Sequence, residues 1–505
     1  MQVNVVKNAK RNVAFGAINR IIIMLCPFVE RAVIQNVLGA QFLGLGSLYT
    51  SIISVLSLTE LGFSSAMVYN MYKPAAEGNV KKMNALLNFY RKTYWIIGCV
   101  ILVIGLLLIP FLPKLINGSY PDEIDIVKLY LIYLGNTAIS YFLFAYLQAV
   151  IVVHQRDDIN SLINSIVKIG LTASQIAVLY ISGNYFLFTC LMPCFTLLNN
   201  LFIGWRVHST FPQYKPSGTL TKEDKEGIKK IVTGTFIQQA CAVTRNSLDS
   251  ICISAFLGLT LTAIYNNYFV ILTGVSTFTG IVTTSFMGGI GNHVATKSVE
   301  DNYQEMKRLD FLYLWIGGWF AICLLCLYQP FMELWMGLDM MLPMPAVVLL
   351  CLYFYILKLG DIRSMYSSAK GLWWEQRYRA LGETLLNLIM NIVLGKLFGV
   401  YGIIIATIIS LFLCNYLWSA GITFRLYFSI CRRRNYYEYQ LKQSTVIVAT
   451  ASITYFTCIF LPISNVLSQL ITRAIICMIV PNTIFYIIYH KSETFKYAKS
   501  KLLGR

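Results

Sequence analysis

The chain has 505 residues, of which 57% are hydrophobic and 13% charged, with a formal net charge of +18. Soluble proteins carry roughly 25% charged residues, so this composition excludes an ordinary water-soluble enzyme or binding domain. The basic charge alone would suit a nucleic-acid partner. Its distribution excludes one, because the Lys and Arg residues are spread over eight short segments between apolar runs.

Apolar runs recur from end to end and are long enough to cross a bilayer. Lipid offers no hydrogen-bond partners, so each run is expected to be a helix that satisfies its own backbone. The first follows the basic segment MQVNVVKNAKRNVAFG without a short cleavable signal, which predicts an uncleaved anchor. In chain order the fourteen predicted spans are 13–36, 42–70, 91–116, 124–152, 159–181, 184–206, 228–256, 261–292, 309–335, 343–369, 374–396, 401–427, 443–465 and 470–490.

The basic residues orient these spans. Counted together with the adjoining ends of the spans, both ends of the chain and the even-numbered connections hold 31 of the 41 Lys and Arg residues, whereas the opposite side, counted in the same way, holds four. By the positive-inside rule, both termini are expected in the cytoplasm. The connections on the opposite side are short, so no external domain is expected.

An internal repeat divides the chain. WIIG at Trp95 and WIGG at Trp315 are each followed by Pro-Phe, and other matches recur in the same order at offsets of 219–221 residues. A unit of six helices places both copies in the same membrane direction. The predicted fold class is an all-α polytopic membrane protein of about 14 helices, with two six-helix lobes in parallel repeat and two extra C-terminal helices. Its parts are expected at 1–210 (N-lobe), 211–227 (cytoplasmic linker), 228–428 (C-lobe) and 429–505 (last two spans and basic tail).

Charged side chains inside the first span point to function. An ionisable group near the bilayer centre costs about 2.5–3.5 kcal/mol on insertion scales, so it needs a purpose. Arg20 and Arg31 lie eleven residues apart and therefore share a helix face, with Pro27 between them as an expected kink. A cationic strip of this kind suits a water-filled cavity. Glu30 is expected to act as a coupling acid or to pair with Arg31.

Other spans add polar groups, each with a structural alternative. Arg245 and Asp249 are spaced for an ion pair, Lys358 could pair with Asp361, and Glu60 could serve as a structural partner of a cation. A polar stripe on the eleventh span fits either a cavity wall or contact between helices. The predicted cavity residues are Arg20, Arg31, Arg245 and Arg363 for an anionic substrate, Glu30, Glu60 and Asp249 for ion coupling, and Asp361, Glu383 and Asn387 as further polar groups, with Asn391 completing the stripe.

Motifs for catalysis are missing from the sequence. It contains no G-x-x-x-x-G-K-[ST] loop for ATP, no H-E-x-x-H motif and no nucleophile elbow, and its four histidines are scattered. Cys323 and Cys326 form a C-x-x-C inside a span without a second pair, which favours core packing over a metal or redox site. We therefore expect a transporter that is not an enzyme and has no metal or organic cofactor, with H⁺ or Na⁺ as the coupling ion.

Three stretches carry a family resemblance. Residues 30–79 (ERAVIQNVLGAQFLGLGSLYT and onward), 245–268 (RNSLDSICISAFLGLTLTAIYNNY) and 369–410 (AKGLWWEQRYRALGE and onward) resemble bacterial polysaccharide repeat-unit flippases. These are the Wzx-type members of the multidrug/oligosaccharidyl-lipid/polysaccharide exporter superfamily, and the resemblance covers nearly the whole chain.

The resemblance implies two lobes around a cavity that opens alternately to each side of the bacterial cytoplasmic membrane. The implied substrate is an undecaprenyl-pyrophosphate-linked oligosaccharide, carried from the inner to the outer leaflet for capsule, O-antigen or exopolysaccharide assembly. Its implied partners are membrane lipids, a polysaccharide polymerase and other assembly proteins, and no nucleic acid. Arg20 and Arg245 lie in stretches comparable to those where related flippases place arginines.

Three other functions compete with this interpretation. A flippase for the cell-wall precursor lipid II shares the superfamily and the number of spans. A multidrug cation antiporter shares the two lobes, but usually has twelve spans and would be disfavoured by a cationic cavity. A lipid-modifying polymerase or ligase typically needs a large external loop, which this sequence lacks.

Overall fold

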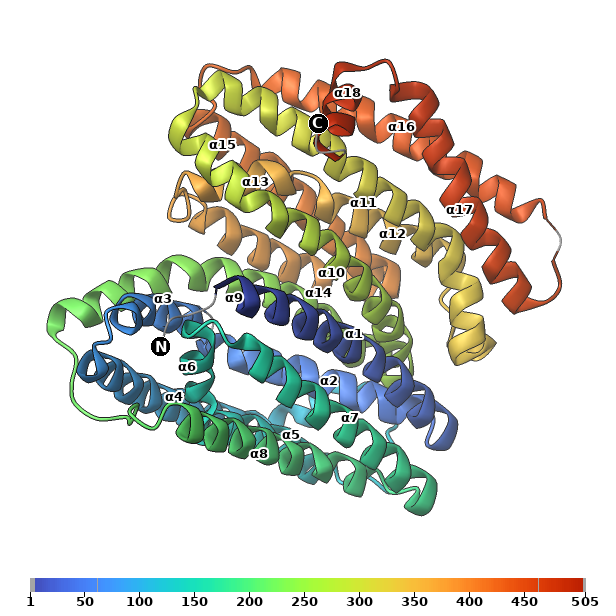
Figure 1. Ribbon diagram of the computed structural model, residues 1–505. Helices are drawn as coiled ribbons and strands as arrows, with labels where there is room; N and C mark the ends of the chain where they lie inside the picture. Colours follow the sequence, from blue (N-terminus) through green and yellow to red (C-terminus); the bar gives the residue numbers. More distant parts are fainter. Residues whose placement is uncertain (1–4, 61, 462, 503–505) are drawn as a thin grey trace. The chain divides into compact units, whose positions relative to one another are not determined.

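The computed structural model describes residues 5–60, 62–461 and 463–502, and within these ranges the chain forms helices and no strands. The predicted all-helical class is therefore confirmed. The helices form two compact units, which we call unit 1 (residues 1–263) and unit 2 (residues 264–505). Figure 1 shows the ribbon of each unit with its helices labelled.

Unit 1 is built from long helices joined by short turns. Within it α1 lies beside α7, and α8 packs against both α5 and α7 (Figure 1). Its helices are α1 (Val5–Val37), α2 (Ala40–Leu56), α3 (Phe63–Ala76), α4 (Val80–Leu108), α5 (Ile126–Phe142), α6 (Gln148–Val153), α7 (Asp157–Ser182), α8 (Tyr185–Thr210) and α9 (Lys222–Leu257), with 3₁₀ turns η1 (Ser57–Glu60), η2 (Ile109–Leu115) and η3 (Ala145–Leu147).

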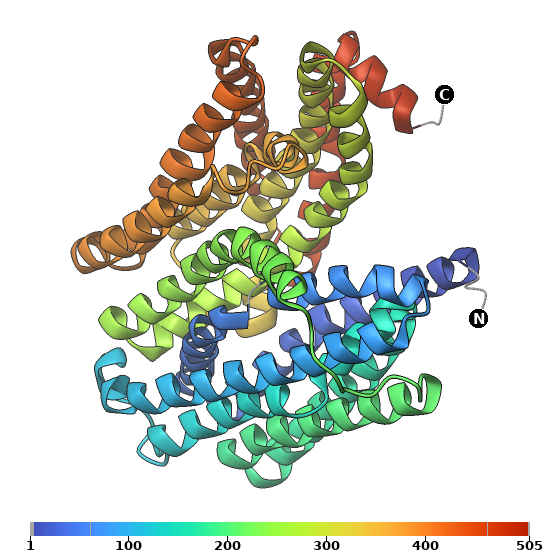
Figure 2. The same cartoon turned by 90° about the vertical axis from the view of Figure 1, so that its left-hand side faces the viewer.

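Unit 2 begins inside α10 (Leu259–Thr296). Its helix α11 packs against α12, α16 and α17, and Figure 2 shows the chain turned by 90° from Figure 1. The remaining elements are α11 (Val299–Met336), η4 (Leu338–Met340), α12 (Met344–Lys358), α13 (Asp361–Ala369), α14 (Arg377–Ser410), the π-helical η5 (Leu411–Trp418), α15 (Ser419–Leu426), α16 (Arg433–Ile459), α17 (Val466–Tyr489) and α18 (Glu493–Leu502).

Polar side chains fix the starts of many helices. The first backbone N–H groups of a helix have no partner within it, and a short polar side chain can accept from them. Asn79 accepts from the N–H of Lys82 at the start of α4, and Asn184 accepts from two N–H groups at the start of α8. Asp125, Thr221, Ser298 and Asn465 cap α5, α9, α11 and α17 in the same way.

Most of the predicted spans can be recognised by length and composition. Among the described residues, nine helices are long and apolar enough to cross a membrane, or ten if α5 and α6, bent by 47°, form one span. One of the nine covers 50 residues, Arg377–Leu426, which at 1.5 Å per residue is far longer than the hydrocarbon core of about 30 Å. Gly399 interrupts it with φ +59° and ψ −137°, and Asn387 donates to Thr407 across this break. The chain thus folds back as the two spans 374–396 and 401–427 predict, although the total of fourteen is not established.

The internal repeat has a backbone counterpart. Gly39, between α1 and α2, has φ +96° and ψ 177°, and Gly258, between α9 and α10, has φ +89° and ψ 174°. This region of backbone space is essentially restricted to glycine. Tyr49 and Tyr268, each ten residues further on, are fully buried. The first two helices of each predicted copy are therefore joined by the same unusual turn.

The two copies differ in what surrounds them. Trp95 on α4 donates to the carbonyl of Phe142 on α5, whereas Trp315 on α11 donates to Asn482 on α17. The unit boundary also differs from the linker expected at 211–227, because α9 belongs to unit 1. Ser254 of α9 donates to the carbonyl of Leu115, which holds the end of this helix against η2.

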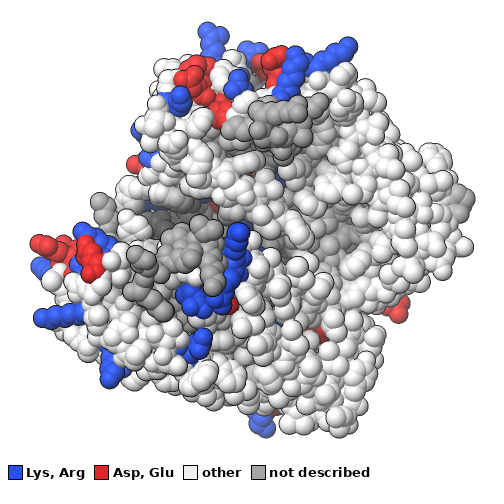
Figure 3. Space-filling view, in the orientation of Figure 1, with Lys and Arg blue, Asp and Glu red and all other residues white. Residues whose placement is uncertain are grey.

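The surface of the helices is largely apolar. On the face shown in Figure 3, wide areas carry neither basic nor acidic residues. Ile18, Ile21 and Leu25 on α1 and Ile166 and Ile169 on α7 are among the exposed aliphatic side chains. Apolar helix faces of this kind suit lipid rather than water, and the chain is a multi-pass membrane protein.

Candidate transport site

A polar cavity of about 510 Å³ lies inside unit 1. Its walls come from α1, from α3 to α8 and from the turns η1 and η3. Among the described residues that line it, Glu60 is the one carboxylate and Lys168 the one ammonium group. The neutral polar lining consists of Ser64, Tyr90, Tyr94, Ser140, Tyr141, Gln148, Asn164, Thr196, Asn199 and Asn200.

A break in the second predicted span positions Glu60. The span expected at 42–70 ends as α2 at Leu56, continues as a 3₁₀ turn through Glu60, and resumes as α3 after Gly62, whose φ of +82° is left-handed. The hydroxyls of Tyr94 and Tyr141 both donate to the Glu60 carboxylate, the latter at 2.7 Å. Each oxygen of the Glu60 carboxylate therefore accepts a hydrogen bond from one tyrosine.

Glu30 on α1 contacts Lys168, one of the residues that line the cavity. The ammonium of Lys168 on α7 lies 2.6 Å from Glu30 Oε1, and the hydroxyl of Thr172 donates to the same oxygen. Side chains of Glu30 and Lys168 are 16% and 25% exposed. Glu30 thus contacts α7, a partner that the sequence analysis did not consider, and its pairing with Arg31 stays a prediction.

Two asparagines on α8 that line the cavity each have a side-chain atom without a hydrogen-bond partner among the described residues. Asn199 Oδ1 and Asn200 Nδ2 are buried and have no hydrogen-bond partner within the part of the chain that the structure describes. Both residues line the cavity. An unpaired amide group in a low-dielectric interior is costly, so a polar molecule in the cavity would be stabilised by them.

The predicted arginines of unit 1 occupy three different settings. Arg20 is exposed on α1. Arg31 donates to Ser47 Oγ on α2 at 3.4 Å and to the carbonyl of Ala263 at 3.3 Å. Arg245 on α9 is 9% exposed. The shared face predicted for Arg20 and Arg31 thus leads to different surroundings, and neither residue lines the 510 Å³ cavity.

Asp249 lies one turn after Arg245 on α9 and is 2% exposed. Asp249 and its counterpart in the repeat, Glu30 on α1, both belong to unit 1. Both predicted acids are thus shielded from water, and Glu30 contacts Lys168, which lines the cavity.

Arg363 of unit 2 is fully enclosed. Its guanidinium donates to the carbonyls of Asn415 at 2.9 Å and Tyr416 at 3.1 Å, and it lies over the rings of Tyr416 and Tyr436. It is 1% exposed. These carbonyls belong to the π-helix η5, so Arg363 stabilises an irregular helix and is not accessible to a substrate in this structure.

The polar stripe of the eleventh span is buried in unit 2, and one of its contacts joins the two arms of α14 across the break at Gly399. Glu383 pairs with Arg379 at 2.8 Å, Asn387 donates to Thr407 at 2.9 Å, and Asn391 donates to Asn387 at 3.3 Å. All three stripe residues are at most 3% exposed. Of the two alternatives that the sequence leaves open, this geometry favours contact between helices.

A second helix break accompanies Asp361. Gly360 is left-handed with φ +81°, between α12 and α13, and the hydroxyl of Tyr313 donates to Asp361 at 2.5 Å. Lys358 lies over the ring of Phe354 and is 6% exposed. Asp310 on α11, which accepts from Gln440, is 1% exposed. Unit 2 therefore also contains buried charges beside a broken helix.

Several of these residues escape the sequence analysis. Lys168 sits in the apolar segment SLINSIVKIG and could have been found as a charge within a span. Tyr94, Tyr141 and Tyr313 carry no such signal, because tyrosine is common in membrane helices and only the fold shows which hydroxyl meets a carboxylate.

These observations define a class: a polytopic helical membrane protein of two units, with charges buried inside each. The fold is that of the MOP-superfamily transporters. The lipid II flippase MurJ, in an inward closed conformation, matches with a TM-score of 0.66 and 16% identity over 95% of this chain and 99% of that chain.

Other matches extend the comparison. A mutant of the Vibrio cholerae MATE transporter VcmN has a TM-score of 0.55 and 14% identity over 86% of this chain and 99% of that chain. A MOP-superfamily transporter from Pyrococcus furiosus has a TM-score of 0.51 and 12% identity over 83% and 96%. No protein-family description and no curated protein matches the sequence. All three neighbours are named as transporters or flippases, and at 12–16% identity they share the fold with this chain.

Proposed function

We propose that the protein is a flippase for a polyprenyl-pyrophosphate-linked saccharide in the bacterial cytoplasmic membrane. The observation that carries the proposal is the match to a lipid II flippase over 95% of this chain and 99% of that one. The MATE transporter VcmN matches less of this chain, 86%, with a lower TM-score. The same observation favours lipid II, the cell-wall precursor, as the cargo.

A second cargo is an oligosaccharide repeat unit on the same lipid pyrophosphate. The resemblance of residues 30–79, 245–268 and 369–410 to repeat-unit flippases favours it. Both cargos present an anionic pyrophosphate, which arginine binds through charge-assisted hydrogen bonds. We assign this contact to Arg20, Arg31 and Arg245. Arg363 is left out, because its guanidinium is taken up by two backbone carbonyls.

Genetic complementation separates the two cargos. Expression in a strain depleted of its lipid II flippase is expected to restore growth if lipid II is carried. Expression in a strain that lacks its repeat-unit flippase restores surface polysaccharide if the repeat unit is carried. Rescue of neither strain, with the protein present in the membrane, would overturn the proposal.

The arginine assignment has its own test. Arg20→Ala and Arg245→Ala are expected to lose complementation while the protein still reaches the membrane. Arg425→Ala is a matched control, since this exposed arginine lies at the end of α15 and outside the proposed site. Full complementation by both site variants would exclude the assignment.

We further propose that protons drive the transport and that Glu60 carries them. Glu60 is the one carboxylate among the described residues that line the cavity, and it accepts from two tyrosine hydroxyls. Na⁺ needs several oxygen ligands. The two tyrosine hydroxyls that donate to the Glu60 carboxylate would compete with Na⁺ for its oxygens, and this favours H⁺ as the coupling ion. In proteoliposomes, movement of a labelled lipid-linked saccharide should respond to an imposed pH gradient in the wild type. The response should vanish in Glu60→Gln and persist in Glu77→Gln, an exposed control on the same segment.

A further inference from the structure

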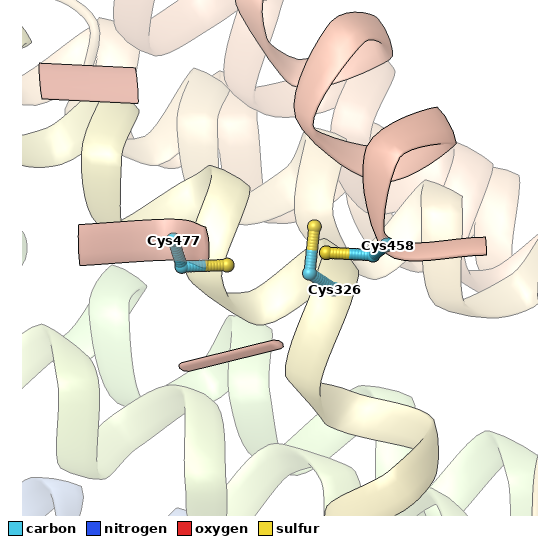
Figure 4. Close-up of side chains that lie close together, drawn as sticks. All are labelled: Cys326, Cys458 and Cys477. Atoms are coloured by element: carbon cyan, nitrogen blue, oxygen red, sulfur yellow. The ribbon is translucent and has the colours of Figure 1, made fainter. Parts of the chain in front are cut away.

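Three buried cysteines from three helices converge in unit 2. Cys326 lies on α11, Cys458 on α16 and Cys477 on α17, and their sulfur atoms all lie within 4.8 Å of one another (Figure 4). The sequence offers only the pair Cys323 and Cys326, which favours core packing. The fold supplies two more thiols from the last two spans, far away in the sequence.

The helices that carry these thiols are held in place by polar contacts. Trp319 Nε1 on α11 donates to the carbonyl of Cys477 at 2.8 Å, and Arg473 on α17 donates to the carbonyl of Cys326 at 3.2 Å. Each contact joins α11 to α17 next to a cluster residue. The three sulfurs are thus presented by a preorganised pair of helices and by the end of α16, which stops at Ile459.

Arg473 also brings a positive charge to the cluster. Its Nε atom is buried and has no hydrogen-bond partner among the described residues, so one donor of the guanidinium remains available. Because the guanidinium donates to the backbone carbonyl of Cys326 itself, its positive charge lies beside the three sulfur atoms.

We propose that Cys326, Cys458 and Cys477 form a binding site for a divalent thiophilic metal ion of the Zn²⁺ type. Zn²⁺ binds thiolate at about 2.3 Å, which places neighbouring sulfurs about 3.8 Å apart in a tetrahedral site. The separations here are compatible with this after small side-chain rotations.

The charges of the three thiolates and of Arg473 favour a divalent ion over a monovalent one. Three thiolates carry three negative charges, and Arg473 neutralises one of them. A divalent ion neutralises the other two, so the loaded site is neutral, as a site inside a membrane requires. Binding releases one proton from each thiol that coordinates, with no oxidation or reduction. The ion ties the two helices that lie outside the predicted repeat, α16 and α17, to α11 within unit 2.

Cd²⁺ is a suitable probe, because its bond to thiolate absorbs in the ultraviolet. The full-length protein, purified in detergent under reducing conditions, is expected to bind one Cd²⁺ with thiolate absorbance. Cys458→Ser and Cys477→Ser should each weaken binding by more than about tenfold, as expected when a coordinating group is lost. Cys351→Ser, a buried cysteine elsewhere in unit 2, is the matched control and should bind as the wild type does. Equal absorbance in wild type and Cys477→Ser would overturn the proposal.

A measurement on the wild type alone guards against misfolded variants. Zn²⁺ should raise the melting temperature of the wild-type protein, and a chelator should lower it again. A melting temperature that does not depend on Zn²⁺ overturns the site. A disulfide between two of these cysteines in protein purified without reductant would also overturn the site, because the cysteines would then form a redox pair and not a metal site. Neither result depends on which lipid the protein carries.

Discussion

Gly44→Ala tests the closest backbone approach in unit 1. A Cβ atom at Gly44 on α2 would lie 2.2 Å from the carbonyl oxygen of Leu259 and 2.7 Å from its carbon. Ordinary C···O contacts are about 3.3–3.6 Å, so roughly 1.1 Å of overlap must be relieved. Both partners are backbone, and neither can rotate away, so α2 has to shift.

The cost follows from this geometry. Overpacking costs about 1–3 kcal/mol, and we expect the upper end, because a helix has to move. Inside a helix, alanine is also more favourable than glycine by about 0.8–1.0 kcal/mol. This gain in helix propensity has to be subtracted before the cost of the overlap can be read from Gly44→Ala. Gly135→Ala on α5 provides that correction, since its Cβ would meet nothing within 4 Å.

The assay is the melting temperature of the two variants in detergent, read by size-exclusion fluorescence. A difference of about 3 kcal/mol corresponds to about 6–12 °C for a unit of this size. We expect Gly44→Ala to melt lower than Gly135→Ala by that amount. Equal melting temperatures, or a more stable Gly44→Ala, would refute the close approach of α2 to Leu259.

Two further predictions concern ion pairs in unit 1. Lys168→Met should destabilise unit 1 by about 1–3 kcal/mol, because Glu30 loses its ammonium partner but keeps the hydrogen bond from Thr172 and some contact with solvent. Glu30→Gln should cost less, and a larger loss of thermal stability in Glu30→Gln than in Lys168→Met would contradict this. The hydrogen bond from Lys82 lowers the pKa of Asp224, so its contribution of about 0.2–1 kcal/mol is present above about pH 4 and is lost as the pH falls through the lowered pKa. Hydrogen exchange of residues 211–221 measured against pH should show this step in the wild type and a smaller one in Lys82→Met.

The sequence predicted the fold class well because lipid imposes a simple rule. Long apolar runs must be helices, and every predicted span overlaps at least one helix within the described residues. Breaks were missed where no proline marks them: the span at 42–70 is divided near Glu60, and the span at 124–152 is divided near Phe144, whose φ is +53°. Hydropathy does not report backbone conformation, so neither break could be read from composition.

The predicted site residues show the same limit. Periodicity placed Arg20 and Arg31 on one face, but it could not show that Arg31 would be engaged by Ser47 and the carbonyl of Ala263. Spacing left Glu30 as a coupling acid or as the partner of Arg31, and it could not reveal the contact with Lys168, 138 residues away. Contacts between distant helices depend on packing, which a single sequence does not encode in its local pattern.

The matching turns at Gly39 and Gly258 have a genetic consequence. Every single-nucleotide change that replaces a glycine adds a side chain, and at φ near +90° and ψ near 175° every such side chain is strained. Neither codon therefore has a neutral missense neighbour. Two such positions, 219 residues apart in one reading frame, would persist after the rest of a duplicated half-gene had diverged. A search for distant relatives can start from this pair of glycines, even where little other identity remains.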